Sequence, residues 1–177
     1  MIQERDGEGP LFALSGDGLM VSTERAASGE TWSAGSIPLC KRDPASTIVL
    51  TGIEALRVSG QVRLEGVGVR TTRWGLPDGP SDPDTHMVGI HRGTPAGVRS
   101  PRGYEVPTSC SSSKDPVGEI VVTLTKTGDA GGVLDGLRVT YEVAAEEHVF
   151  DLQFGFALCG TGKDALQLCD TNGAVGG

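Results

Sequence analysis

The side chains that could bind a metal ion gather between residues 82 and 91: Asp82, Asp84, His86 and His91. The two histidines would point to opposite faces of a strand, and on a helix they would lie about 140° apart. The two aspartates could give oxygen ligands to calcium, but the full D-x-D-x-D-G loop is absent. We therefore expect solvated turn residues here, and we predict no metal or other cofactor.

Two short motifs match those of serine enzymes that form acyl intermediates. Ser111 and Lys114 have the S-x-x-K spacing, and residues 126–128 read K-T-G. That chemistry needs the serine at the start of a helix and the lysine one turn later. Instead, Asp115-Pro116 follows at once and a strand pattern resumes, while the third motif, S-D-N, is missing. We attribute the matches to chance and assign no catalytic residue.

The four cysteines, Cys40, Cys110, Cys159 and Cys169, indicate the compartment. None has CxxC spacing, so their even number favours two disulfides and an extracellular or cell-surface protein over a cytosolic one with reduced thiols. A Gly-Thr-Gly turn after Cys159 favours a local bond to Cys169, which leaves Cys40 for Cys110. The first seven residues lack the apolar region of a signal peptide, so export implies that a leader has been removed.

The longest irregular stretch, residues 75–116, contains seven of the ten prolines and is interpreted as a Pro/Gly-rich insertion. A long insertion in a compact domain usually serves a function. It shows no core-forming alternation comparable with the strands on either side, so we expect it to have no folding role.

Arginine and tyrosine in this insertion are the best candidates for binding a partner. Arg92, Arg99 and Arg102 lie in a stretch without acidic residues, and Tyr104 follows. Both residue types are enriched in binding hot spots, and guanidinium groups pair with carboxylates. We predict these four residues as contacts for a protein partner. The alternative is that the insertion packs on the domain and its arginines pair with the acids of residues 129–151.

Composition limits the class of protein. The 177 residues suit one domain, and 37% hydrophobic with 21% charged residues is enough for a folded core. The 27 glycines and 10 prolines disfavour a helical bundle and favour short strands joined by turns. A net charge of −8 argues against binding to nucleic acid, and no apolar run is long enough to span a bilayer.

Alternating apolar and polar residues predict the strands. We expect strands over residues 47–50, 120–125, 137–143 and 150–158, and a strand or short helical turn over 53–58. Residues 11–14 and 19–22 flank Asp17-Gly18, which predicts a hairpin.

Two of these patterns make sharper predictions. In residues 150–158, alternate positions hold Phe150, Leu152, Phe154, Phe156 and Leu158, so this strand should run through the core. In residues 61–74 the valines and leucine change parity between positions 64 and 67. One core-facing row then requires a β-bulge near Gly66.

Together these patterns predict an all-β fold: a single antiparallel β-sandwich, loosely immunoglobulin-like, carrying the 75–116 insertion. The domain is expected to cover residues 11–170. A flexible segment of residues 1–10 and a flexible tail of residues 171–177 would flank it.

Three functions are consistent with this sequence. The leading one is an exported binding or adaptor module that recognises a protein or other surface ligand through residues 75–110. The second is a structural subunit of an extracellular assembly, which a long uncovered edge strand would favour. The third is a small hydrolase, which would need His86, His91 or His148 within hydrogen-bond reach of a serine.

Overall fold

The computed structural model describes residues 1–14, 19–23, 25–73, 87, 89–111, 115–161 and 169. The eleven elements in these ranges are all strands: β1 (Ile2–Arg5), β2 (Leu11–Ala13), β3 (Leu19–Ser22), β4 (Thr31–Lys41), β5 (Ile48–Gly60), β6 (Val62–Arg73), β7 (Ile90–Arg92), β8 (Tyr104–Glu105), β9 (Pro116–Lys126), β10 (Gly132–Val143) and β11 (Glu146–Leu158). None of the described residues belongs to a helix that is long and apolar enough to cross a membrane.

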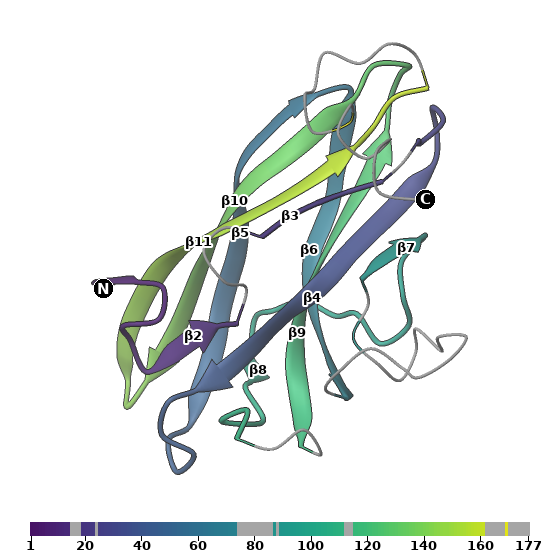
Figure 1. Cartoon of the computed structure of the whole chain (residues 1–177). Coiled ribbons are helices and arrows are strands. Elements are labelled where there is room, and N and C mark those ends of the chain that lie inside the picture. The colour runs from purple at the N-terminus through teal and green to yellow at the C-terminus, as the bar shows by residue number, and fades with distance from the viewer. Residues whose placement is uncertain are drawn as a thin grey trace.

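The strands form two sheets, which confirms the expected all-β class (Figure 1). Sheet A has the order β1-β11-β10-β5-β8, and β3 also pairs with β11. Sheet B has the order β2-β4-β9-β6, and β7 also pairs with β4. Most pairs are antiparallel, but β1 and β3 both run parallel to β11, so the expectation of a purely antiparallel fold is wrong.

The start of the chain differs from the prediction in two ways. Residues 2–5, within the segment expected to be flexible, form β1 on the edge of β11. The predicted hairpin between residues 11–14 and 19–22 is wrong, because β2 pairs with β4 in sheet B while β3 pairs with β11 in sheet A. Alternation identified both strands correctly but carries no information about which sheet each one joins.

One buried apolar cluster draws side chains from both sheets. Sheet B contributes Ile120, Val122 and Leu124, and sheet A contributes the row of β11. All five residues of that row, from Phe150 to Leu158, are at most 1% exposed, as predicted. The strand with three phenylalanines therefore lies in the middle of the core.

The predicted bulge in β6 is present. The register of β6 against β9 shifts between Leu64 and Gly66, so Leu64 pairs with Leu124 and Val67 with Val122. Because of this shift both rows of apolar residues reach the same side of sheet B. The bulge thus keeps β6 in contact with the core on both sides of Gly66.

Both predicted disulfides are formed. Cys40 in β4 bonds to Cys110 across 70 residues, with Cα atoms 5.4 Å apart. Cys159 follows β11 and bonds to Cys169, ten residues later, with Cα atoms 5.6 Å apart. The first bond ties the end of the 75–116 insertion to sheet B, and the second closes a local loop.

The central position of β11 gives the first testable prediction. Phe154→Ala should lower the free energy of unfolding by about 3–5 kcal/mol, the usual cost of deleting a buried phenylalanine side chain. The matched control is Gln153→Ala, because Gln153 is the exposed neighbour on the same strand. Denaturant melts that show less than about 1 kcal/mol for Phe154→Ala would contradict the core assignment.

Candidate binding surface

Residues 89–110, called the strap below, run from one edge of sheet B to the other. At one end β7 pairs with residues 32–34 of β4. Further on, Arg99 exchanges two backbone hydrogen bonds of 2.9 Å with Val69 of β6. Because β9 lies between β4 and β6, the strap must cross sheet B between these two points.

The crossing lies on the face of sheet B that points away from the core. Ser33 and Thr123 are cross-strand partners on this face, and the Ser33 hydroxyl donates a 2.8 Å hydrogen bond to the Gly93 carbonyl of the strap. On β6, a methyl group of Val98 lies only 2.4 Å from the position that a Cβ atom on Gly68 would take. The strap therefore buries polar residues of the outer face, and Ser33 is 0% exposed.

After Arg99 the strap passes to sheet A and then returns to β4. The Leu50 carbonyl of β5 accepts a hydrogen bond from Gly103, and the Ile48 carbonyl accepts one from Val106. Thr108 then accepts a bond from the Lys41 backbone N–H, next to the Cys40–Cys110 disulfide. In its described part, the insertion has a folding role, and the expectation that it has none is wrong.

Arg92 is held against an aromatic ring and an acid. Its guanidinium carbon lies 5.0 Å from the centre of the Trp32 ring, and one of its nitrogens lies 3.1 Å from a Glu30 oxygen. The Glu30 pKa is lowered, mainly by a hydrogen bond from the Ala27 N–H and then by one from the Trp32 indole. The Arg92 side chain is still 68% exposed, so it remains accessible to a partner.

Tyr104 does not belong to the exposed surface, contrary to the prediction that it contacts a partner. It is 2% exposed, and its hydroxyl lies 3.0 Å from the Thr71 hydroxyl and 3.3 Å from the Arg70 carbonyl. Burial raises the pKa of this phenol. Its ring supports Arg99 instead, with the guanidinium carbon 4.9 Å from the ring centre.

Arg99 and Arg102 are both exposed, and neither forms an ion pair with a described acidic residue. The alternative in which strap arginines pair with the acids of residues 129–151 is not observed. In that stretch Asp135 pairs with Arg57, and Asp151 pairs with Arg138. The structure thus brings Arg99 and Tyr104 together, while Arg92 and Arg99 mark opposite edges of sheet B.

Sequence reasoning missed one ion pair on this face. Arg70 of β6 and Glu119 of β9 are cross-strand partners, with Nε and Oε2 2.7 Å apart and side chains that are 2% and 0% exposed. Burying such a pair costs desolvation energy, and removing either partner leaves the other charge buried without compensation. The only sequence signal is that both charges lie in strands at positions facing away from the core.

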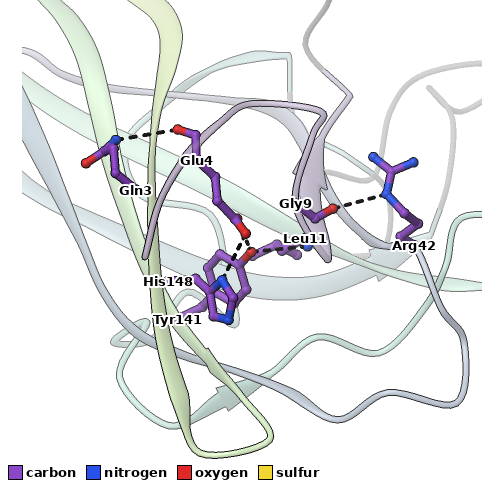
Figure 2. A network of polar contacts seen from close by, with 7 residues as sticks. All are labelled: Gln3, Glu4, Gly9, Leu11, Arg42, Tyr141 and His148. Atoms are coloured by element: carbon purple, nitrogen blue, oxygen red, sulfur yellow. Dashed lines mark hydrogen bonds and ion pairs between the residues drawn. The ribbon is translucent and has the colours of Figure 1, made fainter. Parts of the chain in front are cut away.

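A second polar cluster holds the N-terminal strand (Figure 2). The Glu4 carboxylate accepts a 2.5 Å hydrogen bond from the Tyr141 hydroxyl, and its other oxygen lies 2.9 Å from His148 Nδ1. The rings of Tyr141 and His148 stack, with centres 5.1 Å apart. Burial, followed by the hydrogen bond to Glu4, raises the Tyr141 pKa.

The turn after β1 closes over this cluster. A Cβ atom on Gly9 would lie 1.9 Å from a Glu4 oxygen, so any larger residue here would displace the Glu4 carboxylate from its partners. Arg42 donates to the carbonyls of Gly7 and Gly9 from the other side. The geometry is that of a clamp that fixes β1 on the edge of β11.

The described part of the chain contains no hydrogen bond between a histidine side chain and a serine side chain. His148 is 6% exposed and is bonded to Glu4, while His91 pairs through its backbone with Ser33 of β4. No group of three potential metal ligands occurs among the described residues. Asp82, Asp84 and His86 lie outside these residues.

Comparison of the chain with protein-family models, with curated proteins and with solved structures found no match. The geometry of the strap is therefore the main indication of what the protein binds.

The close approach at Gly68 can be tested directly. Gly68→Ala should lower the free energy of unfolding by about 1–3 kcal/mol, because the added methyl group would collide with Val98 and the Arg99 carbonyl. Gly66→Ala is the matched control, since a Cβ atom at Gly66 meets open space. Equal stability of the two variants in urea melts would show that the strap does not pack on β6.

The clamp predicts a specific pH dependence. Tyr141→Phe should cost about 1.5–3 kcal/mol near neutral pH, since it removes a hydrogen bond to a carboxylate. The pKa of Tyr141 is higher in the folded protein than in the unfolded chain, where it is about 10. The stabilisation from this group is therefore complete below about pH 10 and is lost as the pH rises above that value. The wild-type and variant stabilities should therefore converge as the pH rises from about 10 toward the raised folded pKa. A difference in the free energy of unfolding that stays the same at every pH, measured by denaturant melts, would contradict this role of Tyr141.

Proposed function

We propose that this protein is an exported binding module that recognises a carboxylate-bearing protein partner through Arg92, Arg99 and Arg102 of the strap. Its two disulfides suit an oxidising environment outside the cytosol. Its architecture suits a loosely immunoglobulin-like sandwich, since two sheets share one core.

The position of Arg99 is the observation that carries this proposal. The strap backbone is hydrogen-bonded at both edges of sheet B, to β4 and to β6. The Arg99 guanidinium rests on the Tyr104 ring. A cationic side chain held in this way loses less conformational freedom on binding than a mobile one. No described carboxylate pairs with it, so its donors are available to a partner.

Part of the structure favours the second candidate function, a subunit of a larger assembly. In the described chain, β5 pairs with β10 over most of its length, but on its other edge it pairs with β8 only at Val49 and Leu50. Residues 51–60 are thus a long open edge that could accept a strand from a neighbour. If the protein serves mainly as an assembly subunit, light scattering of the purified protein should show a molar mass that increases with concentration.

The arginines of the strap can be tested against other exposed arginines. Immobilised wild-type protein is expected to retain a partner from extracellular fractions of the source cells. The triple variant Arg92→Ala, Arg99→Ala, Arg102→Ala should lose that partner with little change in Tm. The control triple variant, Arg5→Ala, Arg57→Ala, Arg138→Ala, changes the net charge equally at exposed arginines of sheet A and should keep it.

Mass spectrometry of the retained proteins gives the result. A strap variant that retains the same protein as the wild type contradicts the proposal. A wild-type column that retains nothing above the bare matrix contradicts it as well.

A further inference from the structure

The outer edge of β6 is open beside Arg99. In the described chain, this edge is paired at one place, where Val69 and Arg99 exchange their backbone hydrogen bonds. Backbone groups alternate in direction along a strand, so Val67 directs its N–H and C=O to the same edge as Val69. Residues 62–68 therefore offer a short strand edge that ends at the strap.

A hollow of about 270 Å³ lies at this point. Glu65, Gly66 and Gly68 line it from β6, and Thr94, Arg99 and Ser100 line it from the strap. Gly66 has open space where a side chain would be, so an incoming chain could approach the β6 backbone closely. The hollow thus joins a backbone edge that no described residue pairs with to an arginine without a described acidic partner. The Glu65 carboxylate in its lining is paired with Arg63.

We propose that an extended segment of the partner adds to β6 along residues 62–68 and places a carboxylate in the hollow beside Arg99. This inference rests on the proposed function and names how the partner is bound. Backbone hydrogen bonds to a strand edge supply affinity in such complexes, and a charged pocket supplies selectivity. The open edge of β5 is a poorer fit, because its Arg57 is already paired with Asp135.

The direction of the added segment determines where the carboxylate comes from. The Val69–Arg99 pairing is antiparallel. A segment added antiparallel to β6 would begin beside the strap, so an acidic side chain in its first residue would reach Arg99. A segment added parallel to β6 would end there, and its terminal carboxylate would take the same place.

Synthetic peptides distinguish these cases on the full chain with both disulfides intact. The first probe is acetyl-Asp-Thr-Val-Lys-Val-Thr-Gly-amide, and the second replaces its aspartate with asparagine. The third, acetyl-Gly-Thr-Val-Lys-Val-Thr-Val, has a free terminal carboxylate. A fourth matches the first but carries N-methyl groups at alternate residues, which prevents pairing with a strand edge. Amide shifts of the labelled protein report the site and the affinity.

We expect the first or the third peptide to shift the amides of Val67, Gly68 and Arg99, and the stronger of the two identifies the carboxylate source. That peptide should bind at least about tenfold more tightly than the asparagine peptide, and the N-methylated peptide should not bind. Arg99→Gln should remove the preference for a carboxylate, whereas Arg138→Gln, an exposed arginine of sheet A away from the hollow, should keep it.

The site is overturned if no carboxylate peptide shifts the β6 edge, or if Arg99→Gln leaves the preference unchanged. Loss of the partner by the strap variant together with failure of the peptides would reject this site alone. Peptide binding together with retention of the partner by the strap variant would reject the proposed function while the edge site stands.

Discussion

The path of the strap determines which face of sheet B is covered and which polar residues are buried there. Between β7 and Cys110 the chain touches an edge of β4, the outer face of sheet B, the edge of β6 and the edge of β5 before it returns to β4. A sheet face that would otherwise meet water is therefore covered. The disulfide fixes the far end of the path, and the β7–β4 pairing fixes the near end.

Covering this face explains where its polar residues lie. The Ser33 hydroxyl donates its hydrogen to the Gly93 carbonyl and therefore accepts a 2.8 Å hydrogen bond from the Thr123 hydroxyl. Arg70 and Glu119 form a buried ion pair on the same face. Buried polar groups are tolerated only when they are paired. The Ser33–Thr123 bond therefore favours one placement of β4 against β9, and the Arg70–Glu119 pair favours one placement of β6 against β9.

The sequence predicted well wherever a local pattern determines the structure. The row from Phe150 to Leu158, the bulge at Gly66 and the Cys159–Cys169 pair each follow from residues that are close in the chain. The hairpin of β2 and β3 failed because periodicity does not specify the partner of a strand. Tyr104 was assigned to the surface from composition alone, and its strand β8 has only two residues, too few for alternation to indicate burial.

Only the local part of the candidate site could be predicted from the sequence. Arg92, Arg99 and Arg102 were recognised from composition, but their supports come from elsewhere in the chain. Trp32 and Glu30 lie some sixty residues before Arg92, and contacts over such distances leave no signal in one sequence. The clamp of Glu4, Tyr141 and His148 escaped prediction in the same way, because it joins the first strand to the last two.

Residue-resolved hydrogen exchange of the oxidised protein tests the central claim, that the strap is an integral layer on sheet B. The amides of Val69, Arg99 and Val106 take part in the hydrogen bonds that attach it. They should be protected to within about tenfold of core amides in β9 and β10, because an integral layer opens only with the fold. Exchange of these three amides at the rate of an unstructured peptide, while the β9 and β10 amides stay protected, would contradict this account.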